Sequence, residues 1–354
     1  MRFIHTGDIH LGYAPQSGEK WAQTRADEIW GTFERLIKQI KENPVDMLII
    51  AGDLFDRQPL LREIKEVDYL FSTIKDTKVV LMAGNRDAII PGSFYKDYVW
   101  SDNVIFLGGR NIERISIPEL GVDVYGHSYY TEEIRESLYD NVLVEDPSVI
   151  NILVGHGGER KHIPINRRKF AGSDFDYIAL GHIHNPDLDQ RGKFAYCGSL
   201  EPTNPKDTGI RGYIAGEINS EGLDLEFIPF SKRNYKHLIV DVEPDTNLLE
   251  LKFKVQDYVE RHGHEHIYKF TIKGRRNPLM DIDFEDLAGI CYLAEVVDKT
   301  VPDYDFDLLY DENKDNILGM YVDQFLKKGE AITEVQRKAL QYGTRALLDS
   351  MEEK

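Results

Sequence analysis

Five short polar motifs, each opening with a glycine, lie between residues 7 and 184 of this sequence. They are Gly-Asp-Ile-His at 7–10, Gly-Asp-Leu-Phe-Asp at 52–56, Gly-Asn-Arg-Asp at 84–87, Gly-His-Gly at 155–157 and Gly-His-Ile-His at 181–184. Carboxylate and amide oxygens, combined with imidazole nitrogens, form a ligand set that suits Mn²⁺, Fe²⁺ or Zn²⁺. The motifs can build a metal centre if the fold brings them together.

Buried strands are expected to position these motifs. Apolar runs rich in β-branched residues precede four of them, at 3–6, 47–51, 149–154 and 177–180. Such runs are typical of strands that are covered on both faces of a sheet. Because the carboxyl ends of the strands form the ligand-binding rim of an α/β fold, the polar residues are expected to gather along one edge.

Spacing within the motifs supports a metal centre. Asp8 and His10 are two residues apart, as are His182 and His184, so each pair points to one face of an extended backbone. A glycine, which permits a sharp turn, precedes Asp8, Asp53, Asn85, His156 and His182. Each motif alone could instead be a turn with a capping Asp or Asn. Five motifs in this order favour metal binding.

The order and spacing of the motifs resemble the calcineurin-like metallophosphoesterase superfamily. Gly-Asp-Ile-His-Leu-Gly at 7–12, Phe55 with Asp56, and the motif at 181–184 resemble its SbcD-type nuclease subunits of DNA double-strand-break repair. The resemblance covers residues 1–230 specifically and the remainder more loosely. It implies an α/β fold, a two-sheet αββα sandwich with a small α+β capping domain and C-terminal helices. It also implies a DNA exonuclease and endonuclease that uses two divalent metal ions, expected to be Mn²⁺.

The resemblance also implies roles for individual residues. One metal ion would be held by Asp8, His10 and His184, and the other by Asn85, His156 and His182, with Asp53 bridging the two. Two such ions activate water for attack on a phosphate and neutralise the phosphate charge.

One position departs from the family pattern. The third motif of the family is Gly-Asn-His-Asp, and its histidine contacts the scissile phosphate and protonates the leaving oxygen, whereas this chain has Arg86. Arginine contacts phosphate well but does not release its proton at any working pH. We assign Arg86 and Asp87 as candidate catalytic residues and expect reduced activity. The alternatives are a phosphodiesterase for nucleotides or other small molecules, and a catalytically disabled scaffold that binds DNA ends.

Length and composition limit the other possibilities. A chain of 354 residues is expected to form two or three units, which we place at 1–232, 235–302 and 303–354. No segment approaches eighteen apolar residues, and the start of the chain reads as a strand, so neither a membrane span nor a signal peptide is expected. Cys197 and Cys291 have apolar surroundings and no partner motif, which favours two buried thiols and a cytoplasmic location.

Candidate DNA contacts stand out against the overall net charge of −18. Basic residues follow the fourth motif at Arg160, Lys161, Arg167, Arg168 and Lys169, and two more, Arg275 and Arg276, are expected in a loop of the capping unit. A basic loop beside metal ions can steer a DNA backbone, although such a loop can also be simply solvated.

The second half of the sequence contains strands and helices without the metal motifs. Two strands at 213–218 and 223–229 are expected to form a hairpin. Further strands are expected at 237–242, 267–273 and 294–299, with helices at 247–261 and 284–292. In the family, such a unit of strands and helices caps the catalytic domain and contacts DNA. His262, His264 and His266 lie in a glycine-containing turn, and we interpret them as solvated rather than as a metal site.

The last part of the chain has two expected roles in association. An acidic linker at 303–315 precedes two helices with apolar stripes, which either pack on each other or bind a partner. The resemblance favours docking on an SbcC-like ATPase. It also implies a homodimer formed by residues 60–74 and 94–100, with Leu70, Phe71, Tyr95, Tyr98 and Trp100 as exposed apolar contacts.

Overall fold

The computed structural model describes residues 1–15, 20–278, 280, 287, 289–326 and 332–352. The chain divides into two compact units, Met1–Lys236 and His237–Lys354. The expected break between residues 232 and 235 lies close to this division, and the helices after residue 303 belong to the second unit.

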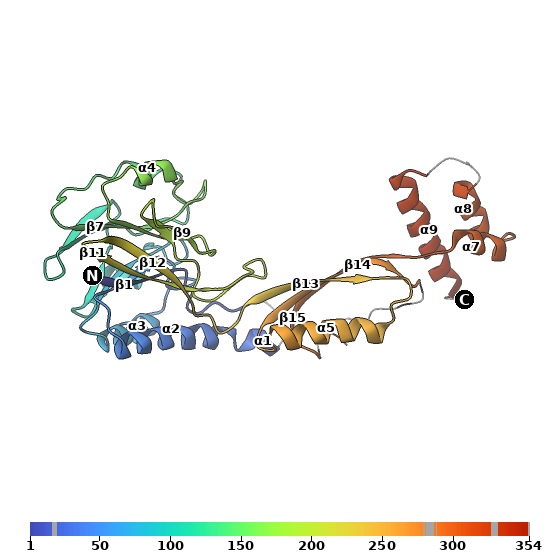
Figure 1. Cartoon of the computed structure of the whole chain (residues 1–354), viewed down its shortest axis with the longest axis horizontal. Coiled ribbons are helices and arrows are strands. Elements are labelled where there is room, and N and C mark those ends of the chain that lie inside the picture. Colours follow the sequence, from blue (N-terminus) through green and yellow to red (C-terminus); the bar gives the residue numbers. More distant parts are fainter. Residues whose placement is uncertain (16–19, 279, 281–286, 288, 327–331, 353–354) are drawn as a thin grey trace. The chain divides into compact units, whose positions relative to one another are not determined.

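The first unit contains two six-stranded sheets (Figure 1). In the first sheet the order is β12-β11-β1-β2-β3-β4, with bounds Gly222–Pro229, Gly212–Asn219, Arg2–Thr6, Met47–Ala51, Lys78–Met82 and Val104–Phe106. In the second sheet the order is β5-β6-β7-β8-β10-β9, with bounds Glu113–Ile117, Val122–Gly126, Ile150–His156, Tyr177–Gly181, Phe194–Tyr196 and Asp187–Asp189. Strands β1 to β4 are parallel, as are β6 to β8 and β10.

Alternating side chains of the strands build the layers of this unit. In β1, Phe3 packs into the core between the two sheets, whereas Ile4 packs into the core beneath the helices. Two helices, α2 (Arg25–Glu42) and α3 (Leu61–Ser72), cover the core that contains Ile4, on the outer face of the first sheet. A four-residue helix, α1 (Lys20–Gln23), precedes them. The far face of the second sheet is covered by the short helix α4 (Arg167–Ala171), the 3₁₀ turn η2 (Leu138–Asn141) and loops, whereas the 3₁₀ turn η1 (Phe94–Asp97) packs on the helix-covered core. The expected α/β sandwich is confirmed, with loops forming much of the fourth layer.

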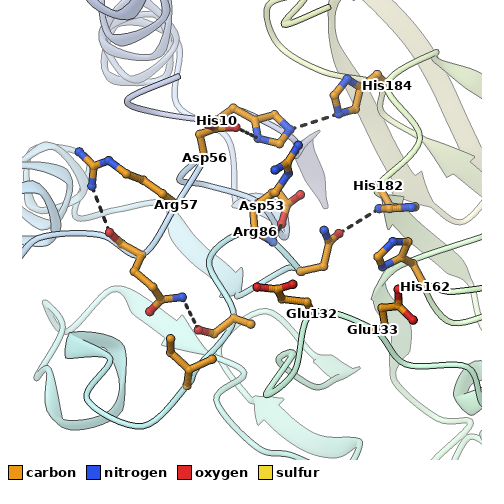
Figure 2. Close-up of a pocket in the computed structure, with 14 residues that line it drawn as sticks. His10, Asp53, Asp56, Arg57, Arg86, Glu132, Glu133, His162, His182 and His184 are labelled. Atoms are coloured by element: carbon orange, nitrogen blue, oxygen red, sulfur yellow. Dashed lines mark hydrogen bonds and ion pairs between the residues drawn. The ribbon is translucent and has the colours of Figure 1, made fainter. Parts of the chain in front are cut away.

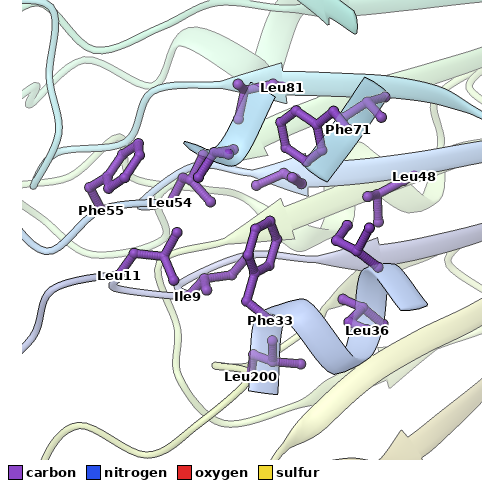
Figure 3. Close-up of a cluster of buried hydrophobic side chains, with 14 of the residues drawn as sticks. Ile9, Leu11, Phe33, Leu36, Leu48, Leu54, Phe55, Phe71, Leu81 and Leu200 are labelled. Carbon is purple, nitrogen blue, oxygen red and sulfur yellow. The ribbon is translucent and has the colours of Figure 1, made fainter. Parts of the chain in front are cut away.

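The helix-covered core reaches into two of the polar motifs (Figure 3). Ile9, which separates Asp8 from His10, is fully buried there beside Phe33 of α2. Leu54 and Phe55, which follow Asp53, are buried in the same cluster. The apolar residues of each motif therefore anchor the polar neighbours that project to the edge of the sheet.

This core also corrects the expected dimer surface. Phe71 of α3 and Tyr95 of η1 have 0% and 1% of their surfaces exposed, so neither can contact a second copy. Leu70, Tyr98 and Trp100 are half-buried and pack against the same cluster. Helix α3 begins at Leu61 because Glu63 accepts the Leu60 backbone N–H at 2.7 Å and caps the first turn.

The second unit begins with a three-stranded sheet in the order β13-β14-β15. Its strands are β13 (Tyr235–Val242), β14 (Ile267–Arg276) and β15 (Tyr292–Pro302), and helix α5 (Leu248–His262) packs on one face. Asn247 begins α5 because its side chain accepts the Glu250 N–H at 3.0 Å. Of the helix expected at 284–292, residues 284–286 and 288 lie outside the described residues, and Tyr292 begins β15 instead of ending a helix.

Three helices end the described chain, where a linker and two helices were expected. They are α7 (Phe306–Glu312), α8 (Ile317–Leu326) and α9 (Glu334–Glu352). The linker prediction was wrong because Asp305 caps α7, accepting the Leu308 N–H at 3.0 Å. Leu318, Val322 and Leu340 form a small shared core, so the helices do pack on one another.

Candidate metal centre

The five motifs lie at the carboxyl ends of β1, β2, β3, β7 and β8. Backbone hydrogen bonds join the first two motifs, since the N–H of Asp8 donates to Gly52 O at 3.1 Å and the N–H of His10 to Asp53 O at 3.1 Å. The N–H of His182 donates to Asp8 Oδ2 at 2.8 Å and links the second sheet to the first. The site therefore straddles the edges of both sheets.

Strained backbone is concentrated at the candidate ligands. Asp8, His10, Asp53 and His182 have φ angles of 47°, 53°, 49° and 86°, in the left-handed region that side chains disfavour. Only two other non-glycine residues of the described chain, Ile163 and Lys193, have positive φ. Each such residue costs roughly 1–3 kcal/mol and persists where the surrounding fold imposes it, often at functional sites.

One group of candidate ligands is formed by Asp8, His10 and His184, whose ligand atoms all lie within 4.8 Å of one another. His10 Nε2 and His184 Nε2 face each other at 3.1 Å. Asp8 Oδ1 is buried and has no hydrogen-bond partner among the described residues, and burial raises the pKa of this carboxyl group. A cation placed here would satisfy the bare oxygen and both nitrogens, so the donors fit a metal ion.

The remaining candidate ligands form a second group around Asn85. Its Oδ1 lies 3.0 Å from His156 Nε2 and 3.1 Å from His182 Nδ1, and Asp53 Oδ2 lies 3.5 Å from His156 Nε2. Burial opposes the charges of Asp53 and His156, but their attraction outweighs it, lowering the pKa of Asp53 and raising that of His156 to about 9. Asp53 also belongs with Asp8 and His156 to a group within 4.8 Å, where a bridging ligand is expected.

Partners on the outer nitrogens orient three of the imidazoles. His10 Nδ1 lies 3.2 Å from Asp56 Oδ1, His184 Nδ1 lies 2.9 Å from Asp207 Oδ2, and His156 Nδ1 lies 2.9 Å from Ala51 O. Each contact leaves Nε2 directed at the cluster, the arrangement that metal-ligating histidines use. Sequence reasoning missed Asp207, because no motif surrounds it and only the fold brings it beneath His184.

The two candidate catalytic residues occupy different environments. Arg86 is exposed and lines a cavity of about 650 Å³ (Figure 2) that is also lined by His10, Asp53, Asp56, Arg57, Gln58, Asn85, Ala88, Ile90, Glu132, Glu133, His162, His182 and His184. Asp87 is fully buried and accepts from Phe55 N, Gly84 N and Tyr95 Oη at 3.1, 2.8 and 3.0 Å. Its catalytic assignment is therefore corrected, because Asp87 holds the loop and does not reach the cavity.

Several expected DNA contacts are already engaged within the protein. Lys161 pairs with Glu133 at 2.7 Å, Arg167 with Asp187 at 2.6 Å, and Lys169 with Asp140 at 3.7 Å. Arg160 and Arg168 are exposed, and no ion pair of theirs is found within the described part of the chain. These two are the freest positive charges of the stretch.

The two basic residues of the second unit differ in exposure. Arg276 is 8% exposed, and its guanidinium donates to Thr300 Oγ1 at 3.0 Å and Met280 O at 2.6 Å. Its assignment to DNA contact is corrected to a structural role. Arg275 is exposed and paired with Asp303, and both arginines end strand β14 instead of lying in a loop.

Two buried thiols were predicted, and the structure fully buries only one of them. Cys197 is fully buried, and burial raises its pKa well above the usual range, whereas Cys291 is half-buried with a pKa raised to about 12. Both thiols are protonated at neutral pH and are poor ligands.

A first test of this geometry uses Gly84. A Cβ at this position would lie 2.2 Å from Asp53 Oδ1, so Gly84→Ala must displace the carboxylate. We expect metal affinity to fall about 10–100-fold, as when a ligand's supporting contacts are lost, measured by titration with Mn²⁺. The matched control is Gly31→Ala on α2, where a Cβ meets nothing within 4 Å. Equal affinity of Gly84→Ala and the unchanged protein would contradict the placement of Asp53.

Comparison with known proteins agrees with this geometry. The family model described as calcineurin-like phosphoesterase matches residues 1–186, which contain all five motifs. The chain belongs to the calcineurin-like phosphoesterase family. The resemblance inferred from the motifs is thus confirmed. Separately, within the described residues no helix combines the length and hydrophobicity that a membrane crossing requires.

Individual relatives add detail. The chain is 30% identical over 236 residues to the DNA double-strand break repair protein Mre11 of Halobacterium salinarum, covering 62% of this chain and 57% of that protein. It is 29% identical over 218 residues to Mre11 of Methanocaldococcus jannaschii, covering 57% of each. The uncharacterized metallophosphoesterase YhaO of Bacillus subtilis is 24% identical over 278 residues, covering 73% of this chain and 67% of YhaO. This chain therefore spans little more than half the length of the two Mre11 proteins.

Proposed function

We propose that this protein is a two-metal phosphodiesterase that hydrolyses DNA, with Mn²⁺ as its working ion. The observation that carries the proposal is the unsatisfied ligand set at the cavity: the bare Asp8 Oδ1 beside the facing nitrogens of His10 and His184. Asp8, His10 and His184 would hold one ion, and Asn85, His156 and His182 the other, with Asp53 between them. Bound divalent ions supply an activated water and neutralise phosphate charge.

The protein's own groups would position the substrate. Arg86 and Arg57 line the cavity. The Arg86 guanidinium can hold a phosphate through two parallel hydrogen bonds, whereas Arg57, whose two terminal nitrogens donate to Glu63, adds positive charge. Arg57 is half-exposed and also pairs with Glu63 at 2.7 Å, which fixes its side chain. These cations and the DNA-repair names of the two Mre11 relatives support a DNA substrate.

Acidic groups at the same cavity favour one alternative. Glu132 and Glu133 line it as well, and carboxylates repel a polyanion more strongly than a small phosphodiester. Glu133 is offset by Lys161 and Arg135, both at 2.7 Å. A small-molecule phosphodiesterase is therefore the second candidate function.

Three substrates separate the candidates. Full-length protein is incubated with Mn²⁺ and labelled duplex DNA, single-stranded DNA or bis-p-nitrophenyl phosphate, and the metal content of the same sample is measured by mass spectrometry. Cleavage of DNA with two ions per chain is expected. Turnover of the nitrophenyl ester alone would favour the small-molecule enzyme, and DNA binding without turnover would indicate a disabled scaffold. Replacing Mn²⁺ by Zn²⁺ or Mg²⁺ tests the choice of metal.

We further propose that the C-terminal helices bind an SbcC-like ATPase. Their shared core leaves Ile317, Met320, Val335 and Tyr342 with 62–78% of their surfaces exposed. The paired substitution Val335→Glu with Tyr342→Glu should abolish co-purification with such an ATPase, because buried carboxylates oppose docking. Leu143→Glu, at a site 79% exposed in the first unit, is the control. Unchanged co-purification of the double variant would contradict the docking surface.

A homodimer is also proposed, through the two segments expected from sequence, 60–74 and 94–100, but with different contacting side chains. Tyr69 of α3 and Val99 after η1 are 69% and 87% exposed, and Phe94 is 47% exposed. Light scattering at tens of micromolar, about the range in which weak interfaces still associate, should give the mass of two chains. Tyr69→Glu with Val99→Glu should give one chain, while Leu143→Glu should remain dimeric. A monomeric unchanged protein would rule out the dimer.

A further inference from the structure

His162 lines the same cavity as the candidate ligands but belongs to neither ligand group. It lies in the loop at 157–163 that follows β7, and its ring centroid is 4.6 Å from that of His182. Figure 2 shows it beside His182 and Glu133 and away from His10. Among the described residues, the other imidazoles that line this cavity are His10, His182 and His184, all assigned to metal.

Backbone contacts hold this histidine in place. The N–H of His162 donates to Glu159 O at 3.0 Å, and its carbonyl accepts from Gly158 N at 2.9 Å. The next residue, Ile163, is fully buried with a φ of 43°, and its N–H donates to Ile134 O at 2.7 Å. A Cβ at Gly157 would lie 2.6 Å from the His162 carbonyl oxygen, so the turn depends on glycine. The imidazole is therefore presented to the cavity by a rigid loop.

The fold itself makes little use of the ring. His162 Nδ1 is buried and has no hydrogen-bond partner within the described parts of the chain. An unpartnered buried polar atom in a native fold calls for a functional explanation. Because the His162 side chain also lines the cavity, the ring is placed to offer an N–H to a ligand there.

We propose that His162 donates an N–H to a non-bridging or leaving oxygen of the phosphate that is hydrolysed. The inference rests on the proposed phosphodiesterase function and assigns a substrate contact that the motifs did not include. The family's phosphate-contacting histidine is replaced by Arg86, so the chain lacks an imidazole at that position. His162, held on a different loop, supplies one. The contact requires no change of protonation, because neutral imidazole carries one N–H.

The test compares three variants of the full-length protein loaded with Mn²⁺. His162→Ala should reduce DNA turnover about 10²–10³-fold, the usual effect of removing one donor to a developing negative charge. His162→Asn, which keeps an N–H donor, should recover part of that loss. His264→Ala, at an exposed histidine of the second unit, is the control. Metal content should stay the same in all three.

Binding of inorganic phosphate, measured by calorimetry, tests the contact independently of turnover. His162→Ala should bind phosphate about tenfold more weakly than the unchanged protein, as expected for one hydrogen bond to a charged group. Equal phosphate affinities of His162→Ala and the unchanged protein would overturn the inference, whether or not any substrate is cleaved. Failure of the unchanged protein to cleave any phosphodiester would count against the proposed function alone. Loss of a metal ion in His162→Ala would also overturn it, because Glu159, His162 and His182 would then be acting as ligands.

Discussion

Asp53→Asn is expected to abolish phosphodiester hydrolysis and to reduce the metal content of both sites. Asp53 Oδ2 approaches His156, and its Oδ1 accepts the Arg86 N–H at 2.8 Å, so this carboxylate lies between the two ligand groups. Asparagine keeps the shape but removes the negative charge that a bridging ligand supplies. Metal ions contribute several kcal/mol to such reactions, so turnover should fall by about 10³-fold or more.

Asp27→Asn is the matched control for this substitution. Asp27 is exposed in the first turn of α2, outside the cavity, and its replacement should leave turnover and metal content unchanged. Metal analysis and initial rates on the same preparations give the result. Full activity of Asp53→Asn with two ions bound would remove the bridging assignment, whereas loss of one ion only would place Asp53 in a single site.

Arg86→His is expected to raise DNA cleavage by about 10²–10⁴-fold, the usual contribution of general acid catalysis. Arg86 contacts Asp53 through its backbone N–H, so the substitution keeps that bond and changes only the exposed side chain at the cavity. A histidine there can give a proton to the leaving oxygen, which arginine cannot do. The gain in rate should be smallest with bis-p-nitrophenyl phosphate, because its leaving group, p-nitrophenolate, departs without protonation.

Rates with duplex DNA and with bis-p-nitrophenyl phosphate separate these effects. Arg62→His, at an exposed position on α3, controls for a change of charge without a change at the cavity. Equal rates of DNA cleavage by the unchanged protein and by the Arg86→His variant would show that position 86 does not face the leaving oxygen. Equal gains on both substrates would instead indicate improved phosphate binding.

Local sequence was sufficient for the ligand types and for the strands that carry them. Apolar runs end at glycines next to Asp8, Asp53 and His182, and a strand buried on both faces must leave its polar residues at its end. The hairpin of β11 and β12 was predicted in the same way, and Asn219 pairs with Gly222 next to its turn. These features depend on near neighbours in the chain, which a sequence displays directly.

Contacts between distant segments were decided by the tertiary structure. Asp207 meets His184 and His162 meets the cavity only because separate loops converge there, and neither residue carries a local signal. The resemblance implied that Phe71 and Tyr95 are exposed dimer contacts, but packing around α2 and α3 buries both. Arg276 likewise looks like a free charge until Thr300 and Met280 accept its hydrogen bonds. Side-chain type and spacing specify which groups can bind or pack, but burial and partners depend on which surfaces meet when the chain folds.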